Sequence, residues 1–221
     1  MVALISVHTP KCAGVSFSRA LEEAYGAEHV LFDYADRPTD PASDMNLDPC
    51  GFFARAAEQV RALPPDIEAV HGHFHIRKYD GLDALRVTFL RHPVDRLISH
   101  YHYWQSYPLG DHQLHRYVIE RGLSLTEFAQ LPMMRRFYTG VFFAGVDMGA
   151  FGFIGLAENY ETDLKRLAAL TGRRFALKRE NTNSEPRYAG RAELDPAEIA
   201  RLEDALREDI AFYENQARRF H

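Results

Sequence analysis

The sequence lacks several features that mark common classes of protein. Only two cysteines occur among the 221 residues, Cys12 and Cys50, which give neither a disulfide framework nor a zinc-binding pattern. No apolar run approaches the roughly 20 residues that cross a bilayer, and the opening MVALISV has no basic leader or cleavage site. We therefore expect an untargeted protein of the reducing cytoplasm, without a membrane span.

Excess positive charge is also absent. The formal net charge is −5, which argues against general electrostatic binding to nucleic acid or to an anionic membrane. A chain of this length buries roughly 70% of its unfolded surface, so one sizeable core is sufficient. Because the chain also contains no internal repeat and no low-complexity linker, we expect a single domain over residues 1–221.

The segment that carries most information is the start of the chain. An apolar run from Leu4 to Val7 is followed by HTPKCAGVSF, residues 8–17. Such a run, ending in a proline, a lysine, small residues and a hydroxyl before an amphipathic stretch, predicts a strand, a phosphate-binding loop and a helix. Backbone amides between Lys11 and Ser16 would form the cradle, while Gly14 permits close approach or a positive φ. These features indicate an anionic nucleotide ligand.

The loop is not an ordinary P-loop. In the pattern GxxxxGK[ST] the lysine directly precedes the hydroxyl residue that binds magnesium, whereas here Lys11 precedes Gly14. This order disfavours a standard metal-dependent NTPase. The segment alone is also compatible with a tight turn that carries an incidental lysine.

Hydrophobic periodicity predicts alternating strands and helices along the chain. The expected strands span residues 4–7, 67–70, 85–90, 152–156 and 174–178, and the expected helices lie over residues 16–25, 52–63, 93–101, 112–121, 124–130, 133–138, 160–170 and 199–217. Short apolar strands of this kind are buried on both faces of a parallel sheet. We therefore predict an α/β fold, a single P-loop-like domain with a central, mainly parallel sheet flanked by helices. A helical insertion over approximately residues 105–150 would shape an acceptor cleft.

Two polar residues follow the predicted strand 85–90. Arg91 stands at its carboxyl end, and Ser99 lies eight positions later, about two turns into the next helix. Ligands of open parallel sheets bind beyond the carboxyl ends of the strands, so both side chains could face one phosphate group. Taken singly, each residue is better explained by a surface role, Arg91 in an ion pair with Asp95 and Ser99 as a solvated hydroxyl.

Three histidines alternate after the predicted strand 67–70. In an extended chain His71, His73 and His75 project to one face. A metal site is one interpretation, but no cysteine or carboxylate completes the ligand set nearby. General-base catalysis is another, because an unperturbed imidazole titrates around neutrality. Histidines bonded to the backbone at a strand end are a third.

Taken together, these motifs resemble the sulfotransferase superfamily, in particular the carbohydrate sulfotransferases related to the heparan sulfate 2-O-sulfotransferases. The resemblance rests on PKCAGVSF, on HGH at 71–73 and on TFLRHPVDRLISHY at 88–101, with weaker matches in GLAENY at 155–160 and NTNSEPRY at 181–188. Members of this family transfer a sulfuryl group from 3′-phosphoadenosine 5′-phosphosulfate (PAPS) to a hydroxyl.

The resemblance implies a set of roles for residues of this chain. The 5′-phosphosulfate would be bound by the loop residues Lys11, Cys12, Ala13, Gly14, Val15, Ser16 and Phe17, the 3′-phosphate by Arg91 and Ser99, and the nucleotide would be closed over by Asn183 and Arg187. His71 and His73 would lie at the acceptor hydroxyl, and Lys11 would stabilise the leaving oxygen. His75 has no counterpart.

The sequence also departs from the family. Many relatives have Thr where this chain has Val15, so one hydroxyl contact to the phosphosulfate is missing. The Golgi members carry a membrane anchor and lumenal disulfides, neither of which we expect in this chain. We therefore expect a bacterial-like cytoplasmic enzyme.

The expected reaction is in-line sulfuryl transfer with a histidine base and no metal requirement, onto a small-molecule or oligosaccharide acceptor. Two alternatives remain at this stage. One is an ATP-dependent kinase or other phosphotransferase, and the other is a non-catalytic nucleotide-binding module. The sequence does not predict an oligomeric state.

Overall fold

The computed structural model describes residues 2–176 and 190–221. Its strands are β1 (Leu4–Val7), β2 (Val30–Asp33), β3 (Ala69–Gly72), β4 (Leu85–Leu90) and β5 (Phe153–Leu156). Its α-helices are α1 (Gly14–Tyr25), α2 (Asp44–Leu47), α3 (Pro49–Arg61), α4 (Pro93–Ser106), α5 (Gln113–Glu120), α6 (Leu125–Gln130), α7 (Pro132–Arg135), α8 (Tyr160–Thr171), α9 (Pro196–Ala205) and α10 (Arg207–Phe220). Shorter 3₁₀ turns include η2 (Ile76–Tyr79), and η3 (Phe137–Phe142) is a π-helix.

The strands form one five-stranded sheet in the order β2-β3-β1-β4-β5, and every neighbouring pair is parallel. This confirms the predicted α/β fold class, although β2 was not predicted. After β1 the chain continues to one side of the sheet and after β3 it crosses to the other, so β1 lies at the point where the strand order reverses. A crevice forms at such a point beyond the carboxyl ends of the strands, and there the phosphate-loop candidate begins.

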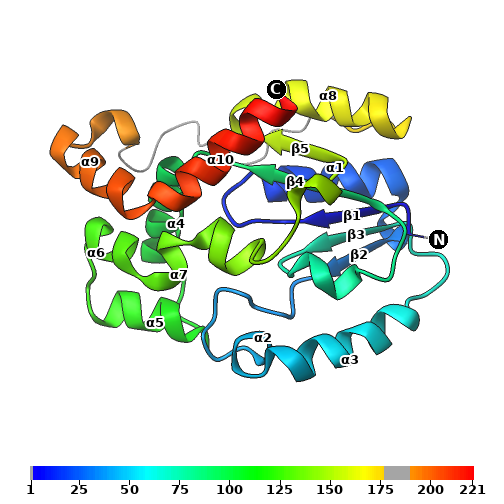
Figure 1. Ribbon diagram of the computed structural model, residues 1–221, viewed down its shortest axis with the longest axis horizontal. Helices are drawn as coiled ribbons and strands as arrows, with labels where there is room; N and C mark the ends of the chain where they lie inside the picture. Colours follow the sequence, from blue (N-terminus) through cyan, green and yellow to red (C-terminus); the bar gives the residue numbers. More distant parts are fainter. Residues whose placement is uncertain (1, 177–189) are drawn as a thin grey trace.

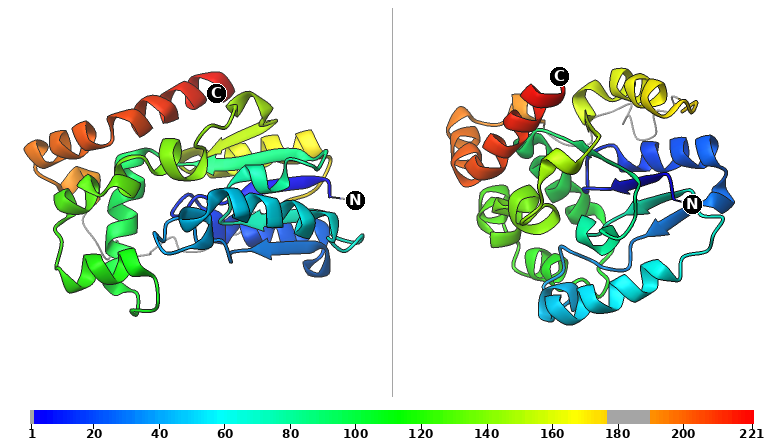
Figure 2. Two further views of the ribbon diagram at one scale, coloured as in Figure 1. Left: turned by 60° about the horizontal axis from the view of Figure 1, so that its bottom comes forward. Right: turned by 45° about the vertical axis from the view of Figure 1, so that its right-hand side comes forward.

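Each strand is apolar on both faces because both faces are covered. Along β1 alternate residues enter two separate cores, with Leu4 packed toward α1 and α8 and Ile5 toward the opposite layer. The two layers are visible in Figure 1, where α1 and α8 lie on one side of the sheet and α3 on the other. Figure 2 shows α10 running along the outside of the fold.

Two predicted elements were wrong in detail. The terminal helix is divided into α9 and α10, because the buried Leu206 leaves helical geometry at φ −100° and ψ 10°. The strand predicted over residues 174–178 is absent from its described part, residues 174–176. There the Phe175 ring packs on the rings of Phe17 and Tyr25 at the α1 layer, so its apolar side chain is partly buried without joining the sheet.

The segment between α4 and β5 consists of α5, α6, α7 and η3, followed by a short 3₁₀ turn. A capping box at Ser124 and Glu127 begins α6. None of the helices in the described residues is long and apolar enough to span a membrane.

Close packing between strands gives the first testable prediction. A Cβ at Gly72 would lie 1.7 Å from the Asp33 carbonyl oxygen of β2, so we expect Gly72→Ala to destabilise the protein by more than about 2 kcal/mol, or roughly 5 °C in Tm at this length. Gly81→Ala is the matched control, because nothing lies within 4 Å of its Cβ position. Equal melting temperatures of the two variants in calorimetry would contradict this packing.

Candidate functional site

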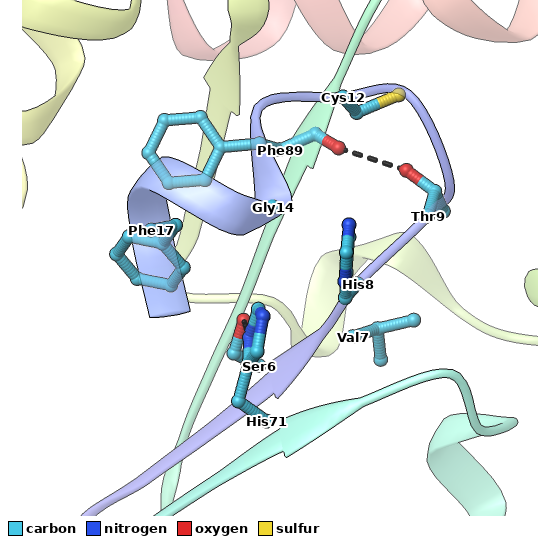
Figure 3. Close-up of a pocket in the computed structure, with 9 residues that line it drawn as sticks. All are labelled: Ser6, Val7, His8, Thr9, Cys12, Gly14, Phe17, His71 and Phe89. Atoms are coloured by element: carbon cyan, nitrogen blue, oxygen red, sulfur yellow. Dashed lines mark hydrogen bonds between the residues drawn. The ribbon is translucent and has the colours of Figure 1, made fainter. Parts of the chain in front are cut away.

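The loop between β1 and α1 has the backbone of an anion cradle. Lys11 and Ala13 both adopt positive φ, at 69° and 62°, and Ala13 is the residue that precedes α1. This conformation turns successive amides inward, toward the free N–H groups of the helix start. The loop is anchored to β4 because the Thr9 hydroxyl donates to the Phe89 carbonyl at 3.0 Å (Figure 3).

Gly14 is required for close approach rather than for a positive φ. A Cβ at this position would lie 1.6 Å from Nε2 of His8, so the imidazole ring packs directly over the first residue of α1. Figure 3 shows the His8 ring between Gly14 and the end of β1. A narrow crevice surrounds this contact, and its walls include Ser6, Cys12 and Phe17.

His8 belongs to a cluster of three imidazoles. Its ring centroid lies 5.0 Å from that of His71, with the two planes nearly parallel, and 4.5 Å from that of His73. The Tyr34 ring, directly after β2, meets His73 edge-on at 4.7 Å. His71 and His73, which the sequence predicts to share one face, both contact His8, a residue that sequence analysis did not single out.

The members of the predicted pair differ in access. His71 is 1% exposed, and its Nδ1 lies 2.9 Å from the Ser6 hydroxyl on the paired strand. Burial and the neighbouring His73 lower its pKa to about 3. His73 is only half-buried, and burial lowers its pKa to about 4. Both rings are therefore neutral at pH 7, and His73 is the one closer to solvent.

His75 points elsewhere. Its Nε2 lies 3.0 Å from the Ala144 carbonyl, and its Nδ1 accepts from the Arg77 amide at the start of η2. These two bonds occupy both ring nitrogens and tie the η2 segment to the chain before β5. We conclude that His75 is a structural histidine, which was one of the three interpretations left open.

Arg91 reaches the loop from β4. Its Nη1 donates to the Lys11 carbonyl at 3.4 Å. Its backbone is clamped by one hydroxyl, because Tyr138 of η3 accepts from the Arg91 amide at 3.0 Å and donates to the Arg91 carbonyl at 2.7 Å. The same hydroxyl lies 3.3 Å from the Cys12 sulfur. Ser99 is half-buried in α4, on the helix that begins two residues after Arg91.

Lys11 and Arg91 form a pair of neighbouring cations. Burial and the charge of Arg91 lower the pKa of Lys11, and the Lys11 ammonium lies 4.3 Å from the ring centroid of Tyr103 on α4. Two like charges held together beside inward-facing amides favour binding of an anion, which would neutralise both.

The remaining loop residues divide between interior and surface. Cys12 is buried and burial raises the pKa of its thiol, so it is a packing residue in this state. Ser16 and Phe17 are also buried, whereas Val15 is 50% exposed. Among the described residues no group of three histidine, cysteine or carboxylate side chains could hold a metal ion.

The predicted nucleotide-closing residues Asn183 and Arg187 lie outside the described residues. Conversely, His8, Tyr34 and Tyr138 are at the site but were missed by sequence analysis. A signal existed for His8, because it follows β1 at the parity of Ser6 and therefore faces the same side as His71. No local pattern marks Tyr138, which reaches the loop from 126 positions away.

Comparison with known proteins gives distant likenesses. No protein-family model and no curated protein sequence matches the chain. Among solved structures, the chain is similar to mouse sulfotransferase SULT7A1 complexed with PAP (TM-score 0.39, 12% identity, 93% of this chain and 63% of that one). It is also similar to retinol dehydratase in a complex with retinol and PAP (TM-score 0.37, 16% identity, 78% and 61%). The chain thus covers less than two thirds of the length of either structure, and we argue its activity from its own residues.

The buried imidazoles make stability depend on pH. Unfolded histidines have a pKa near 6.5, whereas His71 and His73 titrate at about 3 and about 4 in the folded chain. Between these values only the unfolded chain is protonated, so stability is full above about pH 6.5 and falls as pH decreases, by about 1.4 kcal/mol per pH unit for each such group. Urea unfolding between pH 7 and 5 should show this slope.

His71→Asn is the matching variant, because Asn retains a polar atom near the Nδ1 position facing Ser6 but does not titrate. We expect its urea midpoint to change less between pH 7 and 5 than that of the parent protein. An unchanged slope would mean that His71 does not titrate with a depressed pKa.

Proposed function

We propose that this chain is a sulfotransferase that moves the sulfuryl group of PAPS to an acceptor hydroxyl. The observation that carries the proposal is one juxtaposition at the carboxyl edge of the sheet. The cradle formed by the β1–α1 loop, with Lys11 and Arg91 in contact through the loop backbone, adjoins a cluster of neutral imidazoles. An anion site with two cations beside a potential base suits group transfer from an anionic donor.

The cofactor roles follow from the placement of these residues and from the family resemblance. Residues 11–17 would hold the 5′-phosphosulfate through the loop amides and the Lys11 ammonium. Arg91 and Ser99 would bind the 3′-phosphate, since Arg91 emerges from β4 and Ser99 from the helix that follows it. The exposed Val15 side chain adds no hydroxyl, so the loop amides would hold the phosphosulfate without the hydroxyl contact that Thr supplies in many relatives. Asn183 and Arg187 remain proposed contacts to the nucleotide.

Within the imidazole pair, we assign the role of base to His73. His71 is sealed between Ser6, Phe17 and the His8 ring, and an acceptor hydroxyl could not approach it without displacing that packing. His73 is half-buried as a residue and neutral at pH 7. Its Nε2 is buried and, like the Nε2 of His71, has no hydrogen-bond partner in the described part of the chain. His71, a residue of β3, would then serve as a packing partner of the His8 ring.

The reaction balances without an additional reactant. The acceptor oxygen loses its proton to His73 and forms a bond to sulfur, while the bond from sulfur to the phosphate oxygen breaks on the opposite side. The electron pair leaves with adenosine 3′,5′-bisphosphate (PAP), and Lys11 with the loop amides stabilises its developing charge. The products are a sulfate ester, PAP and the proton held by the imidazole.

The acceptor class is assigned from the resemblance to carbohydrate sulfotransferases, which favours a sugar hydroxyl. The helical segments between α4 and β5 would shape its cleft, since η3 contributes Tyr138 to the loop and Phe142 to the edge of His73. Its substrate would be a small sugar or an oligosaccharide.

Ligand binding separates this proposal from its alternatives. At 100 times its Kd a ligand adds about 2.7 kcal/mol to the stability, so PAP should raise Tm by roughly 5 to 10 °C. AMP should give a smaller shift, because it lacks the 3′-phosphate. We expect Arg91→Ala to weaken PAP binding at least about tenfold, whereas Arg55→Ala, an exposed arginine on α3, should not change it. A shift with ATP and none with PAP would overturn the proposal in favour of a phosphotransferase.

The base assignment has a separate test in turnover of PAPS, with a panel of sugar acceptors and radiolabelled donor. Removing a general base costs about 10² to 10⁴ in rate, so His73→Ala should lose that factor in kcat while its Kd for PAP remains within about threefold. His102→Ala, on the outer part of α4, is the histidine control. Full turnover by His73→Ala, or abolished PAP binding, would remove His73 from the role of base.

A further inference from the structure

His8 has no role in the reaction described so far, although it touches every part of the imidazole cluster. Its ring packs on His71 and His73, covers Gly14 at the start of α1 and lies beside Tyr34. Its Nδ1 and the Tyr34 hydroxyl oxygen are 3.2 Å apart. His8 therefore contacts both the loop and the imidazole pair.

The bond between His8 and Tyr34 can run in either direction. Both the Nδ1 of a neutral imidazole and a phenolic hydroxyl can donate or accept, so the tautomer of His8 decides which atom donates. With the proton on Nδ1, His8 donates to the Tyr34 hydroxyl oxygen and its Nε2 is an acceptor.

The position of the other ring nitrogen agrees with this tautomer. Nε2 is the His8 atom nearest to the Cβ position of Gly14, at the helix end where unpaired backbone N–H groups gather. A lone pair is favourable there, and a second N–H would face like partial charges. Burial first, and then His73, His71 and Lys11, hold the pKa of His8 well below its usual value.

We propose that His8 is a positioning residue, which is held by the bond from its Nδ1 to Tyr34 and which fixes the ring of His73 for proton transfer. His73 has ring contacts at its sides, with His8 at 4.5 Å, Tyr34 at 4.7 Å and Phe142 at 6.4 Å, but its Nε2 is unbonded. The orientation of His73 thus depends on the packing of His8 and Tyr34. Because the His8 ring also lies over Gly14, this side chain connects that orientation to the phosphate loop.

The inference rests on the proposed function and is tested by two nearly isosteric replacements. The side-chain amide of Asn can place a donor where His has Nδ1, whereas that of Gln places its polar atoms near Nε2. We expect His8→Gln and His8→Phe to lower kcat by about 10 to 100-fold with a Kd for PAP within about threefold. His8→Asn should recover at least tenfold in kcat over His8→Gln.

Tyr34→Phe should reproduce the loss seen in His8→Phe, and the double variant should be no worse than either single one, because both remove the same bond. Tyr117→Phe, which removes a hydroxyl from an exposed ring, is the control and should leave kcat unchanged. The proposal is overturned when His8→Asn is as impaired as His8→Phe, or when Tyr34→Phe has the parent kcat.

Nitrogen-15 spectra of the imidazoles test the geometry independently of turnover, with the His8 signals assigned from their loss in His8→Asn. We expect a proton on Nδ1 in the parent protein and a shift of the tautomer population toward Nε2–H in Tyr34→Phe. If the parent shows this tautomer but binds no PAP, the proposed function fails and the bond assignment stands. If PAP binds and PAPS turns over but Nδ1 carries no proton, the positioning role fails alone.

Discussion

The site depends on the contact between the His8 ring and the bare Cα of Gly14. This approach is possible only without a Cβ, and it brings the start of α1 against the imidazoles at the ends of β1 and β3. The phosphate loop and the histidines are more than 50 residues apart in sequence, yet the parallel pairing of Ser6 with His71 puts them on one edge of the sheet. The glycine therefore does more than permit a turn, since it lets the start of α1 lie against the His8 ring.

A second constraint acts on Arg91 and comes from α10, near the carboxyl end of the chain. Asp209 of α10 accepts from the amides of Tyr138 and Thr139 at 2.8 and 3.0 Å, which fixes η3, and the Tyr138 hydroxyl in turn fixes the Arg91 backbone and touches Cys12. The buried Arg96 lies over the neighbouring Phe137 ring at 3.7 Å. A buried carboxylate is costly without hydrogen bonds. These bonds therefore stabilise both the Asp209 carboxylate and the backbone of η3.

Features of the fold and of the site were predictable from the sequence where the residues that determine them are close together along the chain. The strand-loop-helix at Leu4 and the place of Arg91 were correct because apolar periodicity and strand ends are local properties. The bend at Leu206 and the packing of Phe175 were missed because tertiary burial decided them. His8 was not singled out, although its position two residues after Ser6 predicts that both side chains face the same side of the sheet. Tyr138 could not be predicted from a local pattern, because its partners are Cys12 and Arg91.

The distribution of charge explains why the histidines are buried. Lys11 and Arg91 stand on the loop side, where charge would accumulate on a departing phosphate, whereas burial keeps His71 and His73 neutral at pH 7. Protonated imidazoles would attract an anionic donor more strongly but could not accept a proton from the acceptor hydroxyl. Under the proposed function, this separation of cations from neutral imidazoles would give donor binding to one set of residues and proton transfer to the other. The stability lost by burying three imidazoles at acidic pH is a consequence of that separation.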